Sequence, residues 1–133
     1  MLHMSTGSFQ RTRKDHSRET AEDYVELIDH LIRLQGDARL VDIAEHLGVS
    51  AVTATQTVQR FQRTGLIRKE PYRSVFLTTK GQQLSNHGRR RHQIVIQFLC
   101  KIGVPAEHAR LDAEGIEHNV SKITLKRMSE FIQ

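Results

Sequence analysis

The chain has 133 residues, of which 38% are hydrophobic, and its formal net charge at pH 7 is +5. This length is enough for one compact domain with an attached helical unit. The positive charge favours nucleic acid or an anionic surface as partner. The sequence has no apolar run long enough to span a membrane and no apolar stretch typical of a secretory signal. Because Cys100 is the single cysteine, an internal disulfide and a multi-cysteine zinc site are excluded, and we expect a reducing cytoplasm.

Residues 1–15 are polar and basic and have no periodicity, which predicts a disordered arm. Residues 16–80 are predicted to form a winged helix-turn-helix. Its first helix carries apolar side chains at helical spacing, and Gly36 suits the end of that helix.

The segment ARLVDIAEHLGVSAVTATQTVQRFQRTGLI has the helix-turn-helix pattern of two short amphipathic helices joined by a tight turn at LGVS. Gly48 suits the turn, and Ser50 can cap the second helix through its hydroxyl. Val52, Val58 and Phe61 are predicted to be the core positions of that helix. The following segment, LIRKEPYRSVFL, alternates in polarity, which predicts a wing of two short strands with EPYRS at its tip.

Residues 81–133 are predicted to form an all-helical domain, so the expected fold class is mainly α. The period of the sequence predicts a long helix from Thr79 to Gly103. Its predicted inner face consists of Ile94, Val95, Phe98, Leu99 and Ile102. Pro105 suits the first turn of the next helix, and Ser121 suits the N-cap of the last.

A helix-turn-helix has a clear physical task, because its second helix must enter the major groove and present hydrogen-bonding groups to base edges. That helix is rich in amides and hydroxyls, and cations that suit phosphate contact surround it. The alternative is a winged helix used for protein contact, but the positive charge favours double-stranded DNA. The predicted DNA-binding residues are Ser50, Thr53, Thr55, Gln56, Gln59, Arg60, Arg63, Arg73 and Lys80.

A second group of polar residues is typical of a metal site. Glu114, Glu117 and His118 have the i, i+3, i+4 spacing that shares one helical face. Alone, this trio also fits a solvated acidic face. Asp23 and Glu26 repeat the pattern beside the apolar stripe of the first helix, and His92 begins the apolar part of the long helix. Six such groups could hold one or two divalent ions per chain, and their hard oxygen donors suit Mn²⁺ better than Cu⁺ or a thiolate zinc site.

Five motifs together, EDYVELI, LVDIAEHLGVS, YRSVFLTTKG, RRHQIVIQFL and GVPAEHARLDAEGIEHNVS, resemble the diphtheria-toxin-repressor family of metal-dependent transcriptional repressors. The likeness is to its manganese transport regulator branch, and it extends from about Glu22 to the end of the chain. It implies a helical metal-binding and dimerisation domain after the wing, homodimers, a palindromic operator and Mn²⁺-activated repression of manganese uptake genes. The implied metal ligands are Asp23, Glu26, His92, Glu114, Glu117 and His118.

Rival functions remain open from the residues alone. A winged-helix regulator could respond to Fe, Co or Zn, or to an organic ligand, although six convergent metal-binding side chains give no reason to expect an organic cofactor. A di-metal hydrolase would need an open coordination site and a substrate cleft. The winged helix-turn-helix takes up much of the chain, so we do not expect an enzyme.

Overall fold

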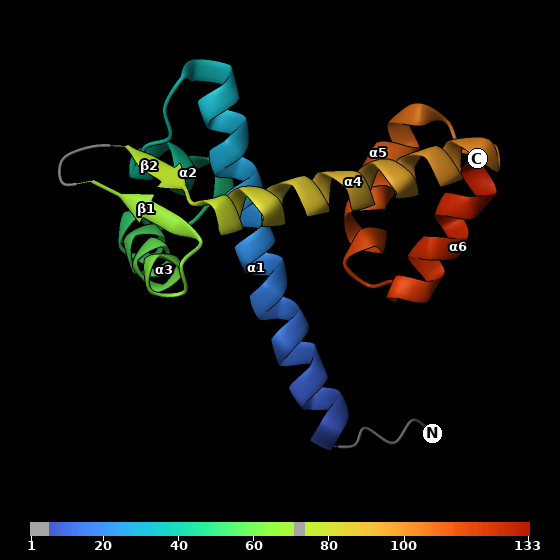
Figure 1. Cartoon of the computed structure of the whole chain (residues 1–133), viewed down its shortest axis with the longest axis horizontal. Coiled ribbons are helices and arrows are strands. Elements are labelled where there is room, and N and C mark those ends of the chain that lie inside the picture. The colour runs from blue at the N-terminus through green and yellow to red at the C-terminus, as the bar shows by residue number, and fades with distance from the viewer. Residues whose placement is uncertain (1–5, 71–73) are drawn as a thin grey trace. The chain divides into compact units, whose positions relative to one another are not determined.

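The structure is a computed structural model that describes the backbone of residues 6–70 and 74–133 and the side chains of residues 20–70 and 74–133. Within these ranges no helix is long and apolar enough to cross a membrane. The predicted fold class is confirmed, since the described part of the chain has six helices and a two-stranded antiparallel sheet (Figure 1). The elements in chain order are α1 (Thr6–Gln35), α2 (Leu40–Leu47), α3 (Ala51–Arg63), β1 (Ile67–Lys69), β2 (Val75–Leu77), α4 (Thr79–Lys101), α5 (Ala106–Glu117) and α6 (Lys122–Ile132).

Two boundaries differ from the predicted ones. The backbone of residues 6–15 is helical as the start of α1, where a disordered arm was expected. Arg, Lys and Gln have good helix propensity, so this segment can extend a helix without an apolar stripe. The chain divides into two compact units after Asn86, whereas the predicted boundary was residue 80. The N-terminal unit therefore includes the first turns of α4.

The core of the N-terminal unit joins α1 to α2, α3 and the wing. Ile28, Ile43 and Val75 have no exposed surface, and Val58 is 1% exposed. The Tyr24 ring meets the Phe61 ring edge-on, with 5.5 Å between the ring centroids. This aliphatic core with one aromatic pair holds α3 against the rest of the unit and so leaves its opposite face to solvent.

The helix-turn-helix has the predicted turn but a different core position. Gly48 has a φ of +67°, a conformation that glycine adopts without steric cost and that ends α2. Val52 was predicted to be buried and is instead 66% exposed, while Ala54 has no exposed surface. Ala54 and Val58 are i, i+4 on one face of α3, and Val52 lies on the opposite side of the helix.

The wing is confirmed as an antiparallel pair in which Ile67 faces Leu77 and Lys69 faces Val75. The Val75 N–H also donates to the Ala38 carbonyl over 2.8 Å, which ties β2 to the segment after α1. The predicted phosphate-contacting Arg73, at the wing tip, lies outside the described residues.

The C-terminal unit has a smaller core of its own, made by α4, α5 and α6. Val95, Ala109 and Ala113 have no exposed surface and Leu99 is 9% exposed. The Ser121 hydroxyl accepts a hydrogen bond of 3.3 Å from the Thr124 N–H, so the predicted N-cap of α6 is present.

Candidate DNA-binding surface and metal-binding residues

Helix α3 presents an uncharged and cationic face to solvent. Gln56, Gln59, Arg60 and Arg63 are exposed on it, and the helix contains no acidic residue. The Arg60 guanidinium lies 5.0 Å from the centroid of the Phe61 ring, which limits the freedom of its side chain. A helix with amide groups toward its middle and cations toward its end can offer hydrogen bonds to base edges and charge to phosphates.

The hydroxyl groups at the start of α3 form hydrogen bonds within the helix itself. The Ser50 hydroxyl accepts a 3.0 Å hydrogen bond from the Thr53 N–H and donates a 2.9 Å bond to the Thr53 hydroxyl. The Thr55 hydroxyl donates to the Ala51 carbonyl over 2.8 Å. Three of the predicted DNA-binding residues therefore have a structural role in forming and capping the helix.

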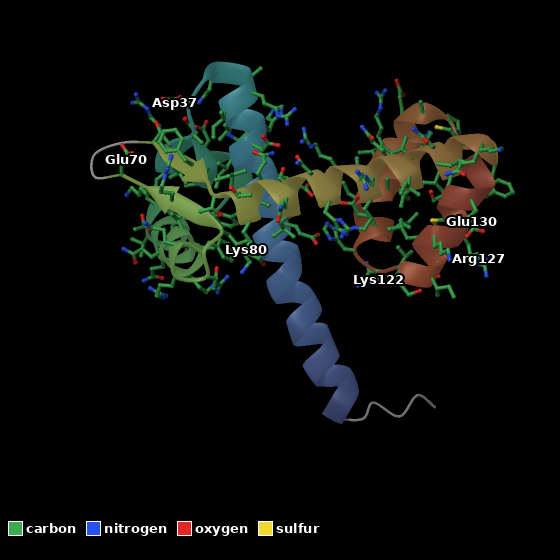
Figure 2. The ribbon with its side chains drawn as sticks, viewed as in Figure 1. Asp37, Glu70, Lys80, Lys122, Arg127 and Glu130 are labelled. Atoms are coloured by element: carbon green, nitrogen blue, oxygen red, sulfur yellow. The ribbon has the colours of Figure 1, made fainter. Side chains whose placement is uncertain are left out.

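Lys80 follows the wing at the start of α4 and is among the labelled side chains in Figure 2. Its ammonium group donates to the Thr64 carbonyl, the C-cap residue of α3, over 3.2 Å. A cation there is favoured by the negative end of the helix dipole. Lys80 thus contacts the C-terminal end of α3 in this structure, and its side chain is exposed to solvent.

In the C-terminal unit, Glu117 lies between two imidazoles. Its Oε2 is 2.9 Å from His92 Nδ1, and its Oε1 is 3.4 Å from His118 Nε2. Glu117 itself is 4% exposed. Helix α5 ends at Glu117, so the predicted shared helical face is cut short. His118 still lies beside Glu117 because the residue keeps a near-helical backbone, with φ of −80° and ψ of −12°.

Burial raises the pKa of the Glu117 carboxyl above its ordinary value, and the nearby His92, His118 and Arg91 act in the opposite direction. A carboxylate that loses hydration on burial regains stability from a cation. Two imidazole nitrogens and a carboxylate are also ligands that divalent first-row metals accept. The chemistry of these three side chains therefore fits a metal ion.

The other three predicted ligands come from α5 and from α1. Glu114 is exposed on α5, Asp23 is exposed on α1, and Glu26 is half-buried on α1. Over residues 20–70 and 74–133, no group of three or more His, Cys, Asp or Glu side chains has an arrangement that could hold a metal ion. Asp23 and Glu26 belong to the N-terminal unit and the remaining four to the C-terminal unit.

Sequence reasoning missed two features of these surfaces. Arg91 ends the basic run GRRR just before His92, yet it is half-buried and its charge acts on Glu117. Asp29 and Ser85 were not singled out, although they form a buried hydrogen bond between α1 and α4. Asp29 follows Glu26 by three residues, and this continuation of the polar face of α1 was the available signal.

Two family models match the chain in succession. The first, iron dependent repressor, N-terminal DNA binding domain, matches residues 16–75. The second, iron dependent repressor, metal binding and dimerisation domain, matches residues 78–133. The chain belongs to the iron-dependent repressor family. The helix-turn-helix and wing accordingly form the family's DNA-binding domain, and α4, α5 and α6 lie in its metal-binding and dimerisation domain.

Two individual proteins are similar to this chain over most of its length. The transcriptional regulator MntR of Escherichia coli O6:H1 is 50% identical over 125 residues, which are 94% of this chain and 81% of that protein. The HTH-type transcriptional regulator MntR of Lysinibacillus sphaericus is 40% identical over 84% of this chain and 81% of its own length.

Solved structures of related repressors have the same fold. A manganese-dependent transcriptional repressor in complex with manganese is 28% identical, with a TM-score of 0.73 over 84% of this chain. IdeR of T. acidophilum is also 28% identical, with a TM-score of 0.72 over 83% of this chain. The chain spans about half the length of these solved chains, 52% in both cases.

Proposed function

We propose that this protein is a manganese-activated transcriptional repressor that binds operator DNA as a homodimer and controls manganese uptake genes. It is a regulator and not an enzyme, as its relatives are named. Two features that occur together in this chain carry the proposal. A DNA-binding domain with an acid-free recognition helix is followed by a domain in which a buried carboxylate lies between two imidazoles.

Six side chains are proposed to hold the metal. His92, Glu117 and His118 already lie in contact in the C-terminal unit. Exposed Glu114 would join them from α5, one turn before Glu117. Asp23 and Glu26 would complete the set from α1. Four carboxylates and two imidazoles are mostly hard donors, which favours Mn²⁺ over softer ions, and one or two ions per chain are consistent with six ligands.

The location of these ligands suggests how metal and DNA binding are coupled. Helix α1 packs on α2 and on β2 in the DNA-binding domain, whereas the other four ligands belong to the C-terminal unit. When ligands from both units are held together, the separation of the two recognition helices in a dimer is restricted. Coupling free energies between two binding sites are typically about 1–3 kcal/mol.

The proposed DNA partner is a palindromic operator, because a two-fold symmetric dimer places two recognition helices on two half-sites. Gln56 is proposed to read a base edge, since an amide can pair with adenine in the major groove. Arg63 is proposed to contact phosphate. A regulator of genes acts where the DNA is, and we therefore infer a cytoplasmic location.

Operator binding measured by fluorescence anisotropy tests the proposal. We expect tighter binding in Mn²⁺ than in a chelator, and we expect Glu117→Ala to abolish the difference while the protein stays folded. Glu130→Ala is the matched control, because Glu130 is an exposed carboxylate on α6 that pairs with Arg127 (Figure 2). Equal operator affinity in Mn²⁺ and chelator for the parent protein would contradict the function, and a response to Fe²⁺, Co²⁺ or Zn²⁺ alone would contradict the choice of metal.

A further inference from the structure

Helices α1 and α4 are joined inside the N-terminal unit by a buried hydrogen bond between side chains 56 residues apart. The Ser85 hydroxyl donates to Asp29 Oδ2 over 3.0 Å. Ser85 has no exposed surface, and Asp29 is 6% exposed. The other carboxylate oxygen, Oδ1, accepts from Arg33 Nε over 3.0 Å within α1. Each oxygen of this buried carboxylate therefore has a defined donor.

A buried polar pair of this kind adds little net stability compared with apolar side chains of the same size, because both groups lose their hydration. The physical effect of this hydrogen bond is to set the position of α4 on α1. The face of α4 around Ser85 is built from small residues, since Gly81 lies one turn earlier and is also buried. A smooth face allows close approach but does not interlock with its neighbour. The directional hydrogen bond therefore holds α4 in one register on α1.

A separate anchor holds the first turn of α4. The Thr78 hydroxyl donates to the Gly65 carbonyl over 2.6 Å, and the Thr78 N–H donates to the Leu66 carbonyl over 3.1 Å. A side chain at Gly81 would overlap that same Leu66 carbonyl. Thr78 and Ser85 are seven residues apart, or about 10 Å along a helix. Leu84 packs against the core between these two anchors, and together the three contacts hold the first turns of α4 in one direction.

We propose that Asp29 and Ser85 are a positioning pair that holds α4 in one direction on the DNA-binding unit, and that the metal response of DNA binding depends on it. The inference rests on the proposed function, because Asp23 and Glu26 lie on α1 and His92 lies on α4. Asp29 follows Glu26 by about one helical turn, and Ser85 precedes His92 by about two. Neither Asp29 nor Ser85 is itself one of the predicted metal ligands or DNA-contacting residues.

The test compares the Mn²⁺-dependent gain in operator affinity between the parent and Ser85→Ala. A coupling of typical size gives the parent a gain of roughly 5- to 150-fold. We expect Ser85→Ala to lose most of this gain while its operator affinity in chelator stays at the parent value. Arg33→Gln is the matched control, since it removes a donor from the same carboxylate without touching α4, and its gain should equal that of the parent.

A conservative substitution and an unfolding measurement without metal distinguish a positioning role from a general loss of stability. Asp29→Asn keeps an acceptor for Ser85 and should retain most of the gain, whereas Asp29→Ala should behave like Ser85→Ala. In chelator, urea unfolding of the two alanine variants and their double variant should show coupling of about tenfold in the unfolding constant. If Ser85→Ala melts below the assay temperature, Ser85→Cys replaces it, because a thiol of similar size is a weaker donor.

The possible outcomes test the positioning pair and the proposed function separately. A parent protein without any Mn²⁺-dependent gain would overturn the proposed function. A normal gain in the parent that persists in folded Ser85→Ala or Ser85→Cys would overturn the positioning pair alone. Additive unfolding effects of Asp29→Ala and Ser85→Ala would also overturn it, because groups that do not interact show no coupling.

Discussion

At the scale of a single residue, two effects act in opposite directions on the charge of the Glu117 carboxyl. It is almost fully buried, which favours the neutral carboxyl, and it lies beside His92, His118 and Arg91, which favour the charged form. Burial is the larger effect, so the pKa is raised. A side chain in this state is costly for the metal-free protein and well suited to a cation, which is the pattern expected of a functional residue.

The raised pKa of Glu117 predicts a pH dependence in the metal-free protein. The native state holds the proton more tightly than the unfolded state does. The free energy of unfolding should therefore fall as pH rises from the ordinary glutamate pKa through the raised one. Glu117→Gln cannot titrate and should lack this fall, while the exposed control Glu130→Gln should retain it. Urea unfolding in chelator at several pH values measures the difference, and identical pH profiles for parent and Glu117→Gln would contradict the prediction.

Gln56 and Arg63, both exposed on α3, should act differently on DNA. Gln56→Ala should relax base preference at one position per half-site, at a cost of about 1–3 kcal/mol for the preferred base. Arg63→Gln should weaken binding to all sequences and reduce the salt slope by about one unit. Affinities for single-base operator variants at several salt concentrations separate the two effects. A uniform loss for Gln56→Ala together with a sequence-dependent loss for Arg63→Gln would contradict the proposed docking of α3.

At the scale of elements, the ends of the helices determine where α3 and α4 begin. The Ser50 hydroxyl caps α3, and Thr78 joins the first turn of α4 to the end of the recognition helix. Both residues satisfy backbone groups that a helix end would otherwise leave without partners. The geometry of the DNA-binding face therefore depends on short-range polar contacts as much as on the core.

Ser50→Ala should lower the free energy of unfolding by about 1 kcal/mol, because the N–H of Thr53 loses its acceptor. Ser50→Asp should restore stability, since a carboxylate also caps a helix. It should not restore operator affinity, because a negative charge at the start of α3 repels phosphate. Thermal unfolding and operator anisotropy measure the two effects. Recovery of DNA binding in Ser50→Asp would show that this end of α3 lies away from the DNA.

Substitution by alanine should have opposite effects on stability at Gly81 and at Gly115. A Cβ at Gly81 would overlap the Leu66 carbonyl, whereas a Cβ at Gly115 meets nothing within 4 Å. Gly115→Ala should therefore stabilise the metal-free protein by roughly 0.5–1 kcal/mol through helix propensity. Gly81→Ala should destabilise it, because α4 or the turn after α3 must move. Urea unfolding in chelator compares the two, and a stabilised Gly81→Ala would mean that this contact is not close in solution.

At the scale of the whole molecule, the C-terminal unit is small and leaves large apolar side chains in solvent. Ile102, Leu111 and Ile123 are 55%, 76% and 65% exposed. Ile102 was predicted to face inward, but α4 buries Val95 and Leu99 instead, and Ile102 lies at the turn that ends the helix. A unit of this size rarely supplies enough core by itself, and the family assigns it to dimerisation.

Leu111→Glu should weaken the dimer, because a charge would replace an exposed apolar side chain in the dimerisation domain. Leu34→Glu is the matched control, since Leu34 is 70% exposed on α1 in the DNA-binding domain. Sedimentation velocity over a concentration series should show a raised dissociation constant for Leu111→Glu only. Operator affinity should fall with it, because a monomer would bind only one of the two proposed half-sites. A dimer unaffected by Leu111→Glu would exclude this face of α5 from the interface.

The sequence by itself determined the local features of this protein. Periodicity located α3 and α4, and Gly48, Ser50 and Ser121 marked helix ends, because turns and caps involve residues only a few positions apart. The kinds of donor side chain that could bind metal were also readable, and the motifs that carry the family resemblance are runs of neighbouring residues. Local signals of this type can be read from the sequence without knowledge of the fold.

Only the tertiary structure decided which polar groups are buried and which of them meet. His92 and Glu117 are 25 residues apart, and Asp29 and Ser85 are 56 residues apart, yet each pair is in hydrogen-bond contact. Neither spacing predicts a contact, because distant segments approach only when their apolar faces pack. The same packing left Val52 exposed while it buried Ala54, since the side of α3 that faces the core depends on where α1 and the wing lie.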